Sequence, residues 1–207
     1  MQVSRKNVFI NCPFDEDYRP LLNVMLYTII YLGYNPIISE TTNSAGNRLE
    51  DIKNLINESI FSIHDISRCR ITKITDLPRF NMPFELGLDI GCITFGNRVQ
   101  KKKKILILEK EQYYYRKVLS DISGQDIENH GDDRMLIIEK IRNWFTKLSP
   151  AKRNDSPMTI WSSFVKFNSE FNKIKRKEKF TTTQIINTSK IEYITAVKEW
   201  INKRRAA

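Results

Sequence analysis

The sequence predicts an open α/β fold in which helices flank a mainly parallel sheet and a helical extension follows at the C-terminus. Over the first 110 residues, short β-rich runs alternate with segments whose apolar residues recur at helical spacing. One run, KILIL at residues 104–108, is apolar throughout, which is typical of a parallel strand buried on both faces. The chain has 207 residues, 41% of them hydrophobic, which suffices for one domain with an appendage and for a core.

The expected strands and helices alternate along the first half of the chain. Gly33 ends the first helix, and Asn81 is expected to cap the third, whose first turn contains Pro83, where proline is tolerated. This alternation of strands and helices implies a parallel sheet with helices on both faces, joined by right-handed crossovers. The expected strands are residues 7–11, 36–39, 61–65 and 104–108, and the expected helices are residues 17–32, 48–59 and 82–95.

The second half of the chain contains fewer strand signals and more charge. Residues 123–133, SGQDIENHGDD, have the composition of a polar loop, and residues 150–157, PAKRNDSP, that of a linker. We therefore divide the chain into an α/β domain, residues 1–149, and a basic helical extension, residues 150–207. The helices expected in this half are residues 133–147, 157–178 and 189–204.

Composition argues against several kinds of site. The cysteines, Cys12, Cys69 and Cys92, are odd in number and widely spaced, so neither a disulfide framework nor a zinc cluster is indicated, and no metal ion or cofactor is expected. The longest apolar run is too short to span a bilayer, and the N-terminus lacks the apolar core of a signal peptide. We therefore expect a cytoplasmic protein without a membrane partner.

The basic charge is concentrated in the extension. The net charge is +10, and residues 150–207 hold 13 lysines and arginines against 5 acidic residues. Within this extension, residues 166–180 interleave Phe167, Phe171 and Phe180 with six basic residues. Two interpretations stay open: the segment binds nucleic acid through charge and stacking, or it is an amphipathic helix with inward phenylalanines and solvated lysines.

The carboxyl ends of the expected strands lie along one edge of the sheet, where open α/β folds bind ligands near a topological switch point. The alternative for the polar residues at this edge is structural, because acids suit the start of a helix and Asp65 would cap a loop. His64, inside an apolar strand, is expected to be a core histidine with satisfied hydrogen bonds. The segments at this edge are Asn11–Asp15, Ser39–Asn47, Asp65–Arg68 and the start of the 82–95 helix.

Glu85 is the main candidate for a reactive group. It lies between Phe84 and Leu86 near the start of the 82–95 helix, and a desolvated carboxylate there would have a raised pKa and act as a proton carrier or nucleophile. The alternative is a solvated glutamate that complements the helix dipole. Gly87 and Gly91 each cost about 1 kcal/mol relative to alanine in a helix interior. We expect them to let the helix approach the sheet closely and so fix Glu85.

Three segments carry a resemblance to a known superfamily: VFINCPFDEDYRPLLNVMLYTIIYLGYNPII, RLEDIKNLINESIFSIHDIS and MPFELGLDIG. Over residues 5–110 they are similar to the TIR-like and nucleoside 2-deoxyribosyltransferase-like superfamily, which implies a flavodoxin-like, TIR-like sheet. TIR domains begin with a strand reading like VFISY and place a catalytic glutamate before a leucine, matched here by Glu85 and Leu86. The deoxyribosyltransferases carry their nucleophilic glutamate in a small–Phe–Glu–Ile–Gly pattern, where this chain has PFELG. The chain also resembles bacterial TIR-like proteins that share NCPFD, RFNMPFELG and SDISGQDI.

The resemblance implies that the chain hydrolyses an N-glycosidic bond in NAD or a related nucleotide. Glu85 would stabilise or attack the oxocarbenium-like sugar carbon, and Asp65 would orient a ribose hydroxyl. Many TIR-like proteins act in anti-phage defence, so we expect an effector gated by assembly into a homo-oligomer or by a partner protein. The residues expected to bind the substrate are Asn11, Pro13, Phe14, Asp15, Ser39, Asp89, Gln125 and Asp126, with a solvated loop as the alternative for Gln125 and Asp126.

The sequence departs from the family patterns at two places. Arg79 stands six residues before Glu85, where the deoxyribosyltransferases have an aspartate, so the proton donor to the leaving base is not assigned. Met82 and Pro83 replace the Trp–Cys pair usual in TIR domains. Because of these two departures, the resemblance does not define the exact substrate of this chain. Two other functions fit the sequence: a nucleotide-binding sensor or adaptor without turnover, and a nucleic-acid-associated effector that uses residues 166–180.

Overall fold

A five-stranded, all-parallel sheet forms the centre of the molecule, with the strand order β2-β1-β3-β4-β5. The computed structural model describes residues 4–39, 47–69, 77–122, 124–125, 127–151 and 154–206. The predicted open α/β class is confirmed. In this order the chain changes direction between the neighbouring strands β1 and β3, which is the switch point of the sheet. The strands are β1 Ser4–Asn11, β2 Asn35–Ile37, β3 Ser59–Asp65, β4 Lys104–Glu109 and β5 Ile127–Asn129.

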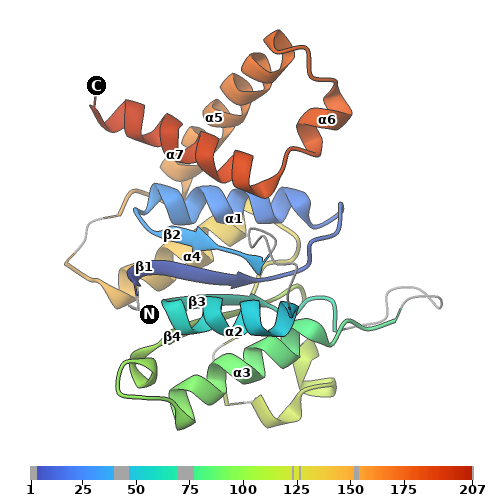
Figure 1. Ribbon diagram of the computed structural model, residues 1–207, viewed down its shortest axis with the longest axis vertical. Helices are drawn as coiled ribbons and strands as arrows, with labels where there is room; N and C mark the ends of the chain where they lie inside the picture. Colours follow the sequence, from blue (N-terminus) through green and yellow to red (C-terminus); the bar gives the residue numbers. More distant parts are fainter. Residues whose placement is uncertain are drawn as a thin grey trace.

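Helices cover both faces of the sheet, as Figure 1 shows. Helices α1 (Arg19–Tyr31) and α4 (Arg134–Leu148) pack on one face, and α2 (Arg48–Glu58) and α3 (Asn81–Phe95) pack on the other. Strand β4 explains why both faces are covered: Leu106 and Leu108 join the core with α1 and α4, whereas Ile107 joins the core with α3. Its apolar sequence is therefore buried on both faces, as predicted.

The C-terminal extension packs on the outer side of α1 (Figure 1). The Tyr27 ring of α1 lies 5.4 Å from the Phe164 ring and 5.6 Å from the Phe167 ring, measured between centroids. Phe167 is 2% exposed and Phe171 is 6% exposed, so both rings point inward, as the amphipathic interpretation of this segment expects. The extension consists of α5 Pro157–Lys177, α6 Thr182–Ile186 and α7 Lys190–Ala206.

Two boundaries and one packing prediction were wrong. Strand β5 lies inside the expected 123–133 loop, because its three residues pair with the edge of β4 and are too few to show a strand pattern. Asn81 is the first residue of α3 rather than its cap, and the capping position is Phe80. Gly87 and Gly91 do not bring α3 close to the sheet, because an added Cβ at either residue would meet no atom of the described residues within 4 Å.

The described residues contain no helix that is long and apolar enough to cross a membrane. Cys12, Cys69 and Cys92 form no disulfide bond; Cys12 and Cys69 are buried, and Cys92 is partly buried. Short 3-10 helices connect the larger elements at Gln100–Lys102, Tyr114–Lys117 and Ser120–Ile122.

Candidate functional site

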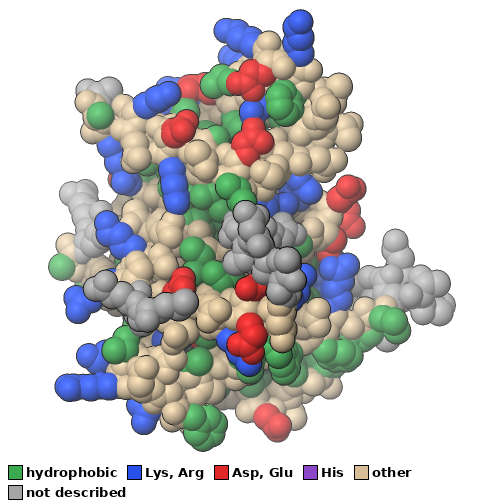
Figure 2. Space-filling model, viewed as in Figure 1, with side chains coloured by type: hydrophobic (Ala, Val, Ile, Leu, Met, Phe, Trp, Pro, Cys, Tyr) green, Lys and Arg blue, Asp and Glu red, His purple; other side chains and the backbone are tan. Residues whose placement is uncertain are grey.

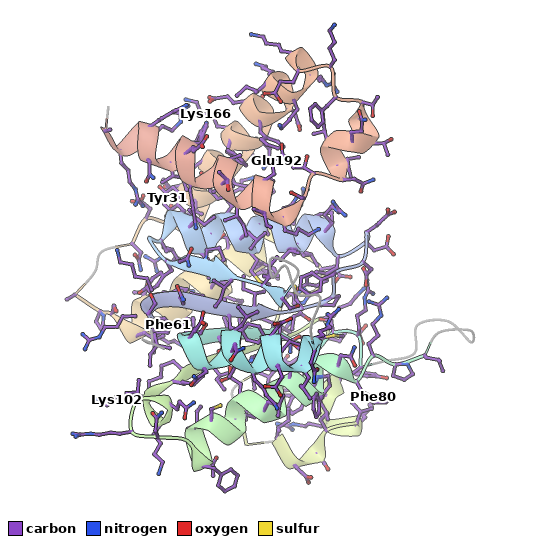
Figure 3. The ribbon with its side chains drawn as sticks, viewed as in Figure 1. Tyr31, Phe61, Phe80, Lys102, Lys166 and Glu192 are labelled. Carbon is purple, nitrogen blue, oxygen red and sulfur yellow. The ribbon has the colours of Figure 1, made fainter. Side chains whose placement is uncertain are left out.

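The carboxyl ends of the strands point to the right in Figure 1, and Phe80, just before α3, is labelled at that edge in Figure 3. Glu85 follows in the second turn of α3 and is 7% exposed. Burial raises the pKa of Glu85 to about 7, and the charge of Arg48, at the start of α2, offsets this only in part. No hydrogen-bond donor reaches the Glu85 carboxylate from the part of the chain that the structure describes. The desolvated carboxylate predicted from the sequence is therefore present.

One turn further along α3, Asp89 belongs to a buried polar network. Asp89 Oδ2 lies 3.0 Å from His64 Nε2, and Asp89 Oδ1 lies 3.0 Å from Lys103 Nζ. Burial alone would raise the pKa of Asp89, but the hydrogen bond from His64 and the charge of Lys103 hold it below its usual range. Lys103 also donates to the carbonyls of Ile56 and Ser59. The network joins α3 to β3 and to the end of α2.

Asn11 determines which nitrogen of His64 carries the proton. The Asn11 side-chain amide donates to the carbonyl of Met82 at 2.9 Å, which orients its NH₂ group, and the same nitrogen lies 2.9 Å from His64 Nδ1. His64 Nδ1 must therefore accept a hydrogen bond, and Nε2 carries the proton that it donates to Asp89. Both ring nitrogens are satisfied, as expected of a core histidine. Asn11 is thus occupied in holding α3 against β1 and β3.

Asp65, at the end of β3, is the centre of a second buried network. Its Oδ2 accepts hydrogen bonds from the Tyr18 hydroxyl and from His130 Nε2, the latter at 2.9 Å, and its Oδ1 accepts from the backbone N–H of Ser67. Burial alone would raise the pKa of Asp65, but the hydrogen bonds from His130, Ser67 and Tyr18 keep it lowered. Both oxygens are occupied and the residue is fully buried, so in this structure Asp65 fixes the surrounding loops rather than facing a ligand.

Ser67, His130 and Asp65 lie together but do not form a nucleophilic triad. In such a triad the serine and the aspartate contact opposite nitrogens of the histidine. Here Ser67 Oγ and Asp65 Oδ2 both lie near His130 Nε2, at 3.1 and 2.9 Å. His130 Nδ1 accepts the backbone N–H of Asp132 and cannot pass a proton along the same line. The arrangement holds a loop and does not activate a hydroxyl.

Asp15 forms a charged clamp at the surface of the same edge. Arg68 contacts both of its carboxylate oxygens, at 3.0 and 3.2 Å, and Arg79 Nη1 lies 3.5 Å from Oδ2. The backbone N–H of Tyr18 also donates to Oδ1. Asp15 therefore joins the loop after β1 to the segment between β3 and α3. Arg79, which departs from the family pattern, takes part in this clamp.

The remaining predicted substrate-binding residues are spread over the edge. Pro13 is buried, Phe14 is half-buried against the core that includes α1, and Ser39 is half-buried after β2. Gln125 is exposed, and Asp126 lies outside the described residues. The structure thus brings Asn11, Asp89 and Glu85 together and leaves Gln125 on an exposed loop.

A pocket of about 370 Å³ opens at the carboxyl edge on the α1 and α4 side of the sheet. Glu85, on the α2 and α3 side, is not among its lining residues. Lys110 forms an ion pair with Asp132 there, and Arg68 is held by Asp15, so much of the pocket's charge is already paired. The pocket is lined by Asp17, Tyr18, Pro20, Leu21, Arg68, Lys110, Asp132 and Arg134.

Sequence reasoning missed the partners that hold the predicted residues. Tyr18 and Lys103 are far from Asp65 and Asp89 in the chain, and no local pattern marks them. The sequence marks His130 as a member of the polar 123–133 loop, but its contact with Asp65 is tertiary information. Over the described part of the chain, no group of three or more histidine, cysteine, aspartate or glutamate residues is arranged to hold a metal ion.

Comparison with protein-family models, with curated proteins and with solved structures gives no match for this chain. The resemblance to the TIR-like superfamily therefore stays a prediction from the sequence segments. The case for function depends on the geometry around Glu85.

Proposed function

We propose that the chain is an enzyme that hydrolyses the N-glycosidic bond of NAD or a related nucleotide, with Glu85 as the catalytic carboxylate. The observation that carries this proposal is the state of the Glu85 side chain. It is buried, its pKa is raised to about 7, and no hydrogen-bond donor from the described residues compensates for its burial. Uncompensated burial of a carboxylate costs free energy, and groups of this kind concentrate at functional sites.

The other buried carboxylates near this edge are all engaged. Asp65 accepts three hydrogen bonds, and Asp89 contacts His64 and Lys103. Glu109 accepts from the backbone N–H groups of Tyr113 and Tyr115. Glu85 is the exception among the buried acids that the structure describes at this edge. Glu85 can therefore contact a substrate without first breaking a hydrogen bond to another described residue.

The chemistry suits a carboxylate in this state. Cleavage of the bond between a ribose carbon and a base nitrogen develops positive charge on the sugar, which a nearby carboxylate stabilises or attacks. A positively charged nicotinamide ring would also lower the pKa of Glu85 and so favour the ionised, reactive form. In the low dielectric of a buried site, this electrostatic stabilisation is stronger than in water.

The direct test is release of free base. The full-length protein is incubated with NAD, NADP, nucleoside monophosphates and nucleosides over a range of protein concentrations, and products are measured by mass spectrometry. Glu85→Gln keeps the shape and removes the charge, so turnover should fall by about 10²–10³ or more. Glu199→Gln makes the same chemical change at an exposed residue of α7 and should leave turnover unchanged. Turnover by Glu85→Gln equal to that of the unchanged protein would refute the assignment.

A non-catalytic nucleotide sensor is the second candidate function. It is favoured by the engagement of Asp65, Asp89 and Glu109, because no second free carboxylate stands ready, among the described residues at this edge, to protonate the leaving base. Calorimetry distinguishes the two functions: a sensor would bind a nucleotide and yield no product after long incubation at high protein concentration.

A further inference from the structure

A second cavity lies between the start of α1 and the C-terminal helices. Its volume is about 430 Å³, within the range of about 300–1,000 Å³ that is typical of small-molecule sites. Pro20 and Arg134 line both this cavity and the pocket at the carboxyl edge, so the two adjoin. Glu85 lines neither of them. A ligand in this cavity would therefore not contact the proposed catalytic carboxylate.

Two arginines in the cavity wall have no acidic partner in the described part of the chain. Arg19 donates from Nη1 to the carbonyl of Ile186 at 2.6 Å, while its Nε is buried without a hydrogen-bond partner. The Arg134 guanidinium lies 5.4 Å from the centre of the Trp161 ring. Guanidinium groups bind phosphates and carboxylates through paired hydrogen bonds. Glu16 also lines the cavity, but neither arginine forms an ion pair with it or with another carboxylate of the described residues, so both guanidinium groups can contact an anionic ligand.

The rest of the wall suits a planar ring with polar edges. Four aromatic side chains line the cavity, and two amide side chains beside them, Asn23 and Asn172, have no hydrogen-bond partner in the described structure. An amide offers a donor and an acceptor side by side, which matches the edge of a nucleobase. The aromatic residues are Trp161, Phe164, Phe171 and Tyr193.

Helix α6 forms a weakly packed cover over this cavity. Of its residues Thr182–Ile186, only Ile185 is partly buried, and Ile186 is 57% exposed. The Arg19 hydrogen bond to the Ile186 carbonyl fastens the end of α6 to α1. A segment with so few buried contacts opens at low cost in free energy. Opening of α6 would give a ligand access and would free Arg19 to bind it.

We propose that this cavity binds a nucleoside monophosphate, with the base against the aromatic wall and the phosphate between Arg19 and Arg134. Tight binding requires both the base and the phosphate, because the aromatic wall contacts one and the two arginines contact the other. The site is independent of hydrolysis at Glu85 and would exist in a protein without any turnover.

The test uses full-length Glu85→Gln protein, so that no substrate is consumed. Isothermal titration calorimetry with AMP, GMP, CMP and UMP should give binding by at least one of them, with a Kd of about 100 µM or tighter. The matching nucleoside and inorganic phosphate, each offered alone, should bind at least about tenfold more weakly. Arg19→Gln and Arg134→Gln should each weaken binding about tenfold or more, because a charge-assisted contact is lost. Arg98→Gln, an exposed residue outside the cavity, is the matched control and should bind normally.

Arg134 is exposed, so its substitution keeps the test valid even if Arg19→Gln destabilises α1. Hydrogen exchange adds a structural readout, since the bound nucleotide should slow amide exchange across residues 182–188. Absence of binding by all four monophosphates at about 1 mM would overturn the proposal. So would binding that both arginine variants retain in full, because the nucleotide would then occupy another site, such as that of Glu85.

Discussion

Neighbouring acids on one helix face respond to burial in different ways. Glu85 and Asp89 lie one turn apart on α3, and both are buried. Burial is the largest influence on the pKa of each, but contacts with His64 and Lys103 reverse its effect at Asp89. The described residues make no such contacts with Glu85, so its pKa remains raised. The difference separates a structural acid from one that can exchange a proton near neutral pH.

The raised pKa of Glu85 predicts a pH-dependent cost in stability. The folded pKa is about 7 against 4.5 for the unfolded chain, so the folded state binds more protons between these values, and stability falls as pH rises through that window. Above pH 7 the cost is up to about 3 kcal/mol. Glu85→Gln should therefore be more stable than the unchanged protein at pH 8, and most of the difference should be gone at pH 5. Urea unfolding at both pH values measures this; a Glu85→Gln protein less stable at pH 8 would show that the carboxylate is stabilised instead.

At the scale of elements, the sequence was informative wherever a segment carried its own pattern. Strands β1, β3 and β4 and the helices of the first half are found close to their predicted residues, because apolar spacing and β-rich runs are local signals. Strand β5 has only three residues, and its pairing with β4 is tertiary information. Gly87 and Gly91 were misread for the same reason: the glycines are visible in the sequence, but the direction in which each faces depends on how α3 is rotated on the sheet.

For the candidate site, the sequence predicted the positions of the polar residues but not their contacts. Parallel topology places Asn11, Asp65 and Glu85 along the carboxyl edge. Burial of Glu85 depends on how α3 is rotated on the sheet, since the neighbouring Phe84 is 55% exposed whereas Leu86 is buried. The engagement of Asp65 by Tyr18 and His130 was not predictable, since the end of β3, the start of α1 and the residue after β5 are distant in the chain. The sequence can thus identify a carboxylate at the ligand-binding edge. It cannot show whether other residues already donate hydrogen bonds to that carboxylate.

Phe167 and Phe171 of α5 point inward, so they cannot stack on a nucleic-acid strand that lies along the outer surface of the extension. Phe180, just after α5, is 36% exposed, and the Lys175 ammonium lies 4.7 Å from the centre of its ring. Lys175 contacts Glu178 and Glu192, and Figure 2 shows basic side chains of the extension interspersed with acidic ones on the visible face. Figure 3 labels Glu192 on α7 and Lys166 on α5. Any binding to RNA or DNA would thus depend mainly on exposed charge. The exposed basic residues near the end of α5 are Lys173, Arg176, Lys177 and Lys179.

We expect no retardation of RNA or DNA in a gel-shift assay at about 150 mM salt, because charge-only contacts weaken steeply with salt. Any retardation at low salt should fall when the four exposed basic residues at the end of α5 are changed to glutamine. The same four changes should alter the free energy of unfolding by no more than about 0.5 kcal/mol. Retardation at 150 mM salt that is lost in this variant would instead establish the nucleic-acid function.

At the scale of the whole molecule, Asp65 connects regions that are distant in the chain. Tyr18 precedes α1, on which the C-terminal helices pack, and His130 follows β5 at the edge of the sheet. Both donate to one carboxylate oxygen at the end of β3. The same Tyr18 hydroxyl is buried, and burial followed by the Asp65 charge raises its pKa well above the usual value, so it remains a donor. Asp65 thus holds the start of α1 and the loop after β5 to the end of β3, while the core packs the rest of α1 on the sheet.

Asp65→Asn should therefore act oppositely to Glu85→Gln. Whichever way the amide is oriented, its NH₂ group faces donors, either the Ser67 N–H or the Tyr18 and His130 pair. Each hydrogen bond to a charged group contributes about 1.5–3 kcal/mol, so unfolding at pH 7 should require about 2–5 kcal/mol less. Because the folded pKa of Asp65 lies below 3.8, its contribution is present above that pH and is lost as pH falls through the folded value, so the two proteins should converge in acid. Exposed Asp121→Asn is the control, and an Asp65→Asn protein as stable as the control at pH 7 would show that Asp65 does not hold these loops together.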